Sequence, residues 1–160
     1  METAYHEAGH AVVGTLLGGR VLSVTIEPDR LEYPDLAGDI EVEWDHSRYS
    51  PQRLLECEIL TALAGPAAEI LYQGGELRAS TISAWRSDWA VALAITDGLF
   101  PTRDMQMRYL GKCCGALREK MNSDTWWWQA IAEVADLLDA HETLEGEEVA
   151  EVVQRWIVRG

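Results

Sequence analysis

The chain has 160 residues, of which 48% are hydrophobic, so we expect one packed domain over residues 1–160. Its formal charge of −14 argues against nucleic acid or an anionic membrane as partner, because both repel an acidic surface. No apolar run is long enough to span a membrane, and there is no room for a signal peptide before residue 6, so we expect a cytoplasmic protein. The three cysteines form no CxxC pair, and we expect them to be free thiols.

The first predicted element is a helix over residues 3–17, which Gly18 and Gly19 end. Residues 20–27 then alternate and predict a strand whose apolar face carries Leu22, Val24 and Ile26. Residues 39–44 alternate again, after a polar loop. Together these two stretches predict a small two-stranded antiparallel β-ribbon with a free outer edge.

The rest of the chain is predicted to be helical. Ser50 and Pro51 open a helix that runs to about residue 73, and Pro66 predicts a kink or a break inside it. Further helices are predicted over residues 84–99, 101–121, 125–141 and 147–158. The expected fold is therefore mainly α, a multi-helix array with one small ribbon.

Three consecutive tryptophans, Trp126, Trp127 and Trp128, stand in the predicted helix over residues 125–141. Three consecutive helical residues spread over about 200°, so they cannot all face one core. At least one should lie at a surface or a subunit contact, and we therefore favour a homo-oligomer.

The first helix contains His-Glu-x-x-His. His6 and His10 are four residues apart, so both imidazoles project from one face and can hold two corners of a tetrahedral zinc. Glu7 lies about 100° round the helix, where it can act as general base toward a metal-bound water. The alternative is a chance match, with a merely hydrogen-bonded histidine pair on a buried helix.

A catalytic zinc needs a third protein ligand. Glu69 and Asp88 are both acids in stretches where the pattern predicts burial, and buried acids are rarely unpaired. The residues alone do not choose between them. His46 and His141 lie in polar segments and are better interpreted as surface histidines.

Five segments, in order, resemble the peptidase domain of the FtsH-type zinc metalloproteases, the membrane-bound AAA+ proteases. The histidine helix resembles that family's active-site helix, and the strand and helical motif that follow resemble their counterparts there. The segments are residues 3–11 (TAYHEAGHA), 21–28, 63–69 (LAGPAAE), 87–89 (SDW) at a helix start, and 138–149 (LDAHETLEGEEV).

The resemblance implies that His6, His10 and Asp88 bind one Zn²⁺ per chain and that Glu7 is the catalytic base. Glu69 then becomes a candidate partner of a zinc-binding histidine. In that family, peptides are thought to bind along an exposed strand edge near the zinc. The corresponding strand here carries Ile40, Glu41, Val42 and Glu43.

The chain also departs from that pattern. It has no GxxxxGK[ST] motif and no membrane span, Pro66 stands in place of the usual arginine, and Ala84-Trp85 stands in place of Gly-Ala. We therefore expect a zinc-dependent endopeptidase for unfolded or extended polypeptides without its own ATPase motor, or one fed by a separate ATPase partner. The alternative is a non-catalytic metal- or peptide-binding module.

Overall fold

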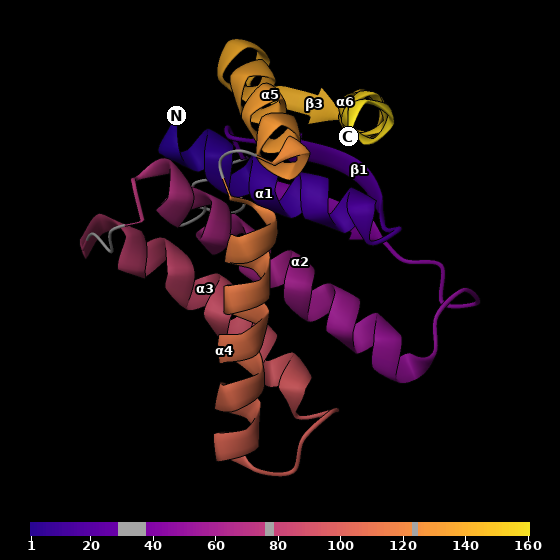
Figure 1. Ribbon diagram of the computed structural model, residues 1–160, viewed down its shortest axis with the longest axis vertical. Coiled ribbons are helices and arrows are strands. Elements are labelled where there is room, and N and C mark those ends of the chain that lie inside the picture. The colour runs from indigo at the N-terminus through magenta and orange to yellow at the C-terminus, as the bar shows by residue number, and fades with distance from the viewer. Residues whose placement is uncertain (29–37, 76–78, 123–124) are drawn as a thin grey trace.

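The computed structural model describes residues 1–28, 38–75, 79–122 and 125–160, without the side chains of residues 79–84. It is mainly helical with a small antiparallel sheet, which confirms the predicted fold class (Figure 1). In chain order, the elements are α1 (Glu2–Leu16), β1 (Arg20–Thr25), β2 (Asp39–Glu43), α2 (Pro51–Tyr72), α3 (Ala79–Thr96), α4 (Arg103–Lys120), α5 (Trp126–His141), β3 (Thr143–Glu145) and α6 (Gly146–Arg159).

The sheet has three strands in the order β2-β1-β3, so the predicted two-stranded ribbon was incomplete. The missing strand is β3, whose central residue Leu144 is 1% exposed and pairs with Val24 of β1. Three residues are too few to show an alternating pattern, which is why the sequence did not reveal this strand. β2 remains an outer strand, and no other strand of the described residues pairs with its second edge.

A β-bulge in β1 corrects the predicted apolar face of that strand. The pairing with β2 shifts register between Val21 and Ser23, and the residue between them is Leu22. Val21 and Val24 are both buried, although an odd spacing would place them on opposite faces of a regular strand. Leu22 is only partly buried, so the prediction that it shares the buried face was wrong.

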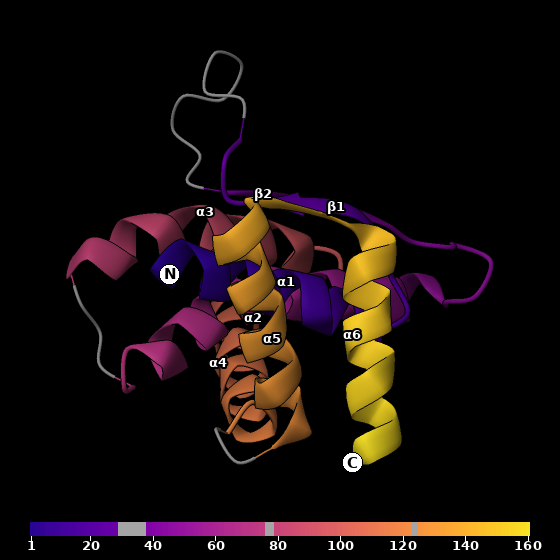
Figure 2. The same ribbon diagram turned by 90° about the horizontal axis from the view of Figure 1, so that it is seen from above.

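Helix α1 lies at the centre of the molecule, with the sheet along one side of the helical array (Figure 2). Ala4, Ala8 and Ala11 are fully buried in it, because small side chains let other elements approach closely. The closest approach is to α2 at Gly9. A Cβ atom there would lie 2.5 Å from the carbonyl oxygen of Ala64 and 2.7 Å from Cβ of Ala68.

We expect Gly9→Ala to lower the free energy of unfolding by about 1–3 kcal/mol or more, because the added methyl group meets backbone that cannot move aside easily. Gly14→Ala, in the same helix, is the matched control. Its Cβ would lie 3.4 Å from the nearest atom of Thr61, an ordinary contact, so helix propensity should leave the protein as stable or up to about 1 kcal/mol more stable. Urea unfolding of both variants measures the difference, and equal stabilities would contradict the close α1–α2 packing.

Helix α2 is continuous through Pro66, so the predicted break does not occur. Ser50 caps the helix by accepting a hydrogen bond from the backbone N–H of Arg53, as predicted, and Pro51 occupies the first turn. An interior proline removes one backbone donor at a cost of about 3 kcal/mol. Pro66 is itself buried, and burial of its ring helps to offset this cost.

Helix α3 begins at Ala79, five residues before the predicted start. Asp88 therefore lies inside the helix and not at its start, which corrects the expectation from the resemblance. At least one complete helical turn of α3 precedes Asp88 and at least one follows it, so helix geometry fixes its backbone.

The three tryptophans at the start of α5 are all partly buried. Trp128 stacks on Tyr5 with ring centroids 5.3 Å apart, and Tyr5 stacks on Tyr72 at 4.2 Å. Trp126 and Trp127 contact each other at 5.9 Å. Each of the three tryptophan rings thus contacts another ring of the same chain, and the homo-oligomer stays a prediction. No described helix is both long and apolar enough to cross a membrane.

Candidate metal centre

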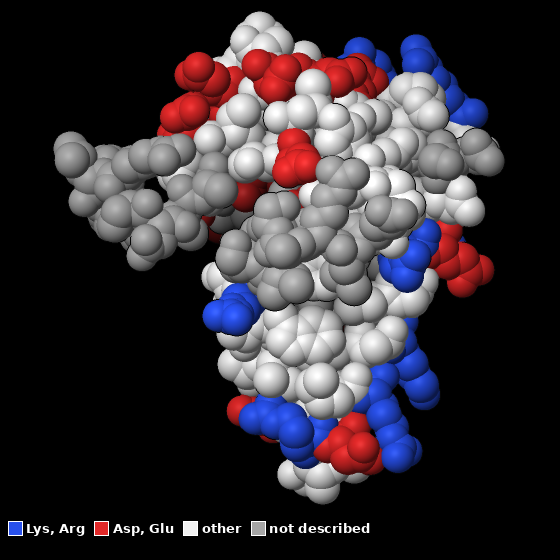
Figure 3. Space-filling view, turned by 90° about the vertical axis from the view of Figure 1, so that its left-hand side faces the viewer, with Lys and Arg blue, Asp and Glu red and all other residues white. Residues whose placement is uncertain are grey.

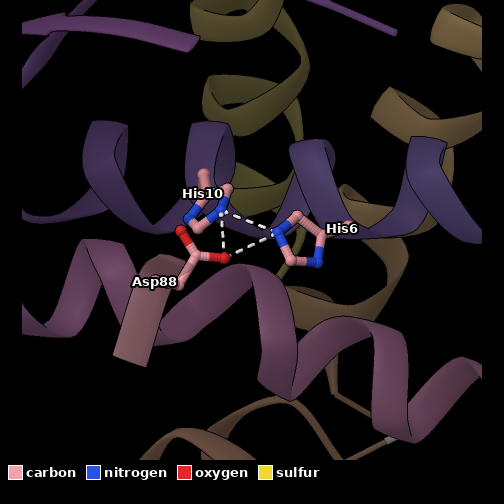
Figure 4. A group of neighbouring side chains, drawn as sticks. All are labelled: His6, His10 and Asp88. Carbon is pink, nitrogen blue, oxygen red and sulfur yellow. Dashed lines mark hydrogen bonds and ion pairs between the residues drawn. The ribbon is translucent and has the colours of Figure 1, made fainter. Parts of the chain in front are cut away.

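Two histidines of α1 and one aspartate of α3 converge on a single point (Figure 4). His6 and His10 project from successive turns of α1 and are 8% and 5% exposed. Asp88 reaches them from α3 and is partly buried. Helix periodicity places the two imidazoles side by side, and the packing of α3 supplies the carboxylate from 78 positions further along the chain (88 − 10).

The separations among the three donor atoms fit a tetrahedral metal ion. His6 Nε2 lies 2.8 Å from Asp88 Oδ2 and 3.1 Å from His10 Nε2, and His10 Nε2 lies 3.5 Å from Asp88 Oδ2. Ligands at zinc-to-donor distances near 2.0–2.1 Å are roughly 3.3 Å apart in a tetrahedron. Two imidazoles and one carboxylate are also a donor set typical of catalytic zinc, with one corner left for water.

The far nitrogen of each imidazole is fixed by a hydrogen bond. His6 Nδ1 is 2.8 Å from Glu69 Oε2, and His10 Nδ1 is 2.7 Å from the carbonyl oxygen of Thr61. An acceptor at Nδ1 holds a proton there, so Nε2, which faces the cluster, is the atom that would offer its lone pair to a metal. The structure thus separates the two acids that the residue pattern left open: Asp88 joins the cluster, whereas Glu69 lies behind His6.

Gly65 of α2 lets His10 take its position. A Cβ atom at Gly65 would overlap the His10 ring, with its Cδ2 atom only 2.8 Å away. The ring therefore lies directly against the backbone of α2, close to Thr61. The sequence drew attention to Gly65 only as the neighbour of Pro66, and its role in seating the histidine was missed.

Hydrogen bonds across the cluster shift the pKa values of its members when no metal is bound. Burial alone would lower the pKa of His6, but its hydrogen bonds with the Asp88 and Glu69 carboxylates outweigh burial and raise that pKa to about 10. Burial would raise the pKa of Asp88, but the hydrogen bonds from His10 and His6 hold it well below its usual range. Without a metal ion, a proton on His6 thus supplies positive charge at the place where a metal cation would bind.

Glu7 is 5% exposed and follows His6 directly in α1. Burial raises the pKa of its carboxyl group above the usual range, while the nearby His10 and His6 act in the opposite direction. The backbone of Gly38 lies against this carboxylate, so close that a Cβ atom on Gly38 would be 2.6 Å from Glu7 Cδ. Gly38 immediately precedes β2, and the start of the outer strand is thus held beside the candidate base.

The remaining histidines lie outside the cluster. His46 and His141 are both exposed, as the polar segments around them predicted. Trp85, one helical turn before Asp88 in α3, and Pro66 of α2 line a small apolar cavity of about 50 Å³ between α2, α3 and α4. The two departures from the FtsH-type pattern thus lie together, and the indole nitrogen of Trp85 has no hydrogen-bond partner among the described residues.

Comparison with known proteins bears on this site. No protein-family model matches the chain. The chain is, however, 29% identical over 156 residues to the ATP-dependent zinc metalloprotease FtsH of Pelobacter propionicus, an alignment that covers 91% of this chain. The chain is a distant relative of FtsH. It spans only 24% of the length of that FtsH, so the activity of the whole enzyme does not transfer with the similarity.

This relationship confirms the resemblance drawn from the motifs. The similarity to FtsH extends over nearly the whole chain and is not limited to the His-Glu-x-x-His helix. The geometry adds a His6, His10 and Asp88 group that could hold a metal, drawn from two helices. The FtsH relative is described as a zinc protease, and zinc at this site follows from that similarity alone.

Proposed function

We propose that this FtsH-related chain is a zinc-dependent endopeptidase that hydrolyses unfolded or extended polypeptides. The observation that carries the proposal is a buried carboxylate, Glu7, adjacent to a converging His-His-Asp group whose histidine tautomers are fixed from behind. A purely structural zinc site usually fills all four positions with protein ligands and has no use for a base.

In this proposal, His6, His10 and Asp88 hold the ion. Bound zinc supplies Lewis acidity toward the peptide carbonyl and lowers the pKa of a water molecule to about 7. Glu7 accepts the proton of the attacking water and delivers it to the leaving amine. Its raised pKa suits both steps, because a base that must later act as an acid works best with a pKa nearer the operating pH.

The outer strand β2 supports the preference for extended chains. Its second edge is unpaired among the described residues, and its first residue follows Gly38, which lies against Glu7. An extended peptide that adds to this edge along Ile40, Glu41, Val42 and Glu43 would run past the base. Folded domains offer no free strand of this kind, so a separate ATPase partner would be needed to supply them.

The test combines metal analysis with digestion of an unfolded protein such as casein. We expect about one zinc per chain, cleavage that a chelator abolishes, and recovery of cleavage when zinc is added back. A protein that binds zinc through this group but cleaves no unfolded substrate would instead be the non-catalytic metal- or peptide-binding module. A protein that cleaves equally well in the presence of chelator would contradict the metal mechanism.

A further inference from the structure

The exposed face of β2 carries a row of carboxylates. Asp39, Glu41 and Glu43 are exposed, while the two residues between them, Ile40 and Val42, are partly buried and pack against the core. Residues two apart in a strand point to the same side, so the three carboxylates line one face of the outer strand. The same strand has the edge with which no described strand pairs, and on this edge the proposed substrate would add.

Little in the described part of the chain neutralises this row. Glu43 lies 3.7 Å from Arg20 in a well-exposed ion pair, which is worth little in water. Across the strand pair, Glu41 is opposite Ser23 and Asp39 is opposite Thr25, neither of which is charged. Within the part of the chain that the structure describes, no ion pair involves Asp39 or Glu41.

The charge of the whole chain acts in the same direction. Of the 13 basic residues, five lie on α4, which extends from near α5 to the lower end of the molecule in Figure 1, namely Arg103, Arg108, Lys112, Arg118 and Lys120. Acidic side chains gather along the left and centre of the upper edge in Figure 3, with some basic side chains at its right. A cationic peptide is therefore attracted toward the end that holds β2, and a polyanionic peptide is repelled from it.

We propose that the outer edge of β2 selects extended peptides with lysine or arginine at alternate positions, through Asp39, Glu41 and Glu43. In an added antiparallel strand, side chains directly opposite one another on one face are about 4.5–5.5 Å apart, so alternate residues of the peptide meet the three carboxylates. The residues between them point toward the protein and see Ile40 and Val42, and they should be apolar. This inference rests on the proposed function and names the substrate class of that same site.

The test measures binding separately from cleavage, in the zinc-loaded Glu7→Gln protein. Its probes are three labelled peptides of equal length that alternate an apolar residue with lysine, glutamine or glutamate. We expect the lysine peptide to bind about fivefold to tenfold more tightly than the glutamine peptide, and the glutamate peptide to bind most weakly. The preference should shrink when salt is raised from about 0.05 M to 0.5 M, because the carboxylates are exposed.

Two sets of variants locate the preference. Glu41→Gln/Glu43→Gln should reduce the lysine preference to less than about twofold, and Glu41→Lys/Glu43→Lys should make the glutamate peptide the tighter ligand. Glu119→Gln/Glu151→Gln changes the net charge equally at exposed positions on α4 and α6 and should leave the preference unchanged. Equal binding of the three peptides, or an equal loss in both double variants, would overturn the inference.

Cleavage by the parent protein keeps the two proposals apart. If the parent cleaves unfolded proteins but the three peptides bind alike, the selectivity is wrong and the endopeptidase stands. If the lysine peptide binds preferentially but the parent cleaves nothing, the edge of β2 binds cationic peptides without hydrolysing them, and the proposed function fails.

Discussion

Glu7→Gln should abolish peptide cleavage while leaving zinc bound. Glutamine keeps the shape of the side chain but cannot accept a proton from water, and a general base contributes about 10²–10⁴-fold to the rate. We therefore expect kcat to fall by about a thousandfold, with KM for an unfolded substrate nearly unchanged. His6, His10 and Asp88 remain in place, so the metal content should stay near one per chain.

The same substitution should not destabilise the fold. Glu7 is buried, and burial raises the pKa of its carboxyl group, which means that the ionised form is disfavoured in the folded protein. An uncharged glutamine avoids this cost, so Tm should be equal or slightly higher. Glu2→Gln, an exposed position in the same helix, is the matched control and should retain full activity. If Glu7→Gln cleaves as fast as the parent, Glu7 is not the base.

The sequence predicted the elements whose signal is local. The four-residue spacing of His6 and His10 fixes them on one face of any helix, and the Ser50-Pro51 start of α2 was found because a cap and a first-turn proline are local features. Helix α5 was also predicted to within one residue of its observed bounds. These features depend on neighbours in the chain and needed no tertiary information.

The features that the sequence did not predict depend on contacts between distant segments. β3 is only three residues long and exists because β1 presents an edge to it. Gly38 and Gly65 matter because each lies directly against a side chain of α1, Glu7 in one case and His10 in the other. No sequence pattern around Gly38 or Gly65 could have shown these contacts.

The choice of the third metal ligand shows how far local sequence patterns reach and where tertiary contacts are needed. Burial patterns pointed equally to Glu69 and Asp88, because both acids stand among small or apolar residues. Only the packing of α2 and α3 on α1 shows that one carboxylate faces Nε2 of His6 and the other faces Nδ1. The family resemblance chose the same residue, Asp88, although it expected that aspartate at a helix start and not in the helix interior.

Zinc binding should become stronger as the pH rises, by about tenfold per pH unit between pH 7 and pH 9. In the metal-free protein the pKa of His6 is about 10, so zinc must displace its proton over this whole range. Asp88, whose pKa lies well below its usual range, is already ionised and releases none. Competition with a chelator of known affinity, repeated across the pH range, measures this slope.

The metal-free protein should show the opposite trend in stability. A folded-state pKa raised above the unfolded value of about 6.5 contributes stability that is complete below pH 6.5 and is lost as the pH rises toward 10. The Tm of the metal-free protein should therefore fall between pH 7 and pH 9, and the increase in Tm on adding zinc should grow. His141→Gln removes an exposed histidine away from the cluster and should change neither trend.

Glu69→Gln identifies the source of the displaced proton. The Glu69 carboxylate is one of the two hydrogen-bond partners that raise the pKa of His6, and glutamine keeps an acceptor there without the charge. The variant should therefore release fewer protons per zinc at pH 8 than the parent, measured by calorimetry in buffers of different ionisation enthalpy. Ionisation of zinc-bound water is common to both proteins and cancels in the comparison. Equal proton release, together with an NMR titration of metal-free His6 centred near pH 6.5, would show that the two carboxylates do not hold a proton on His6.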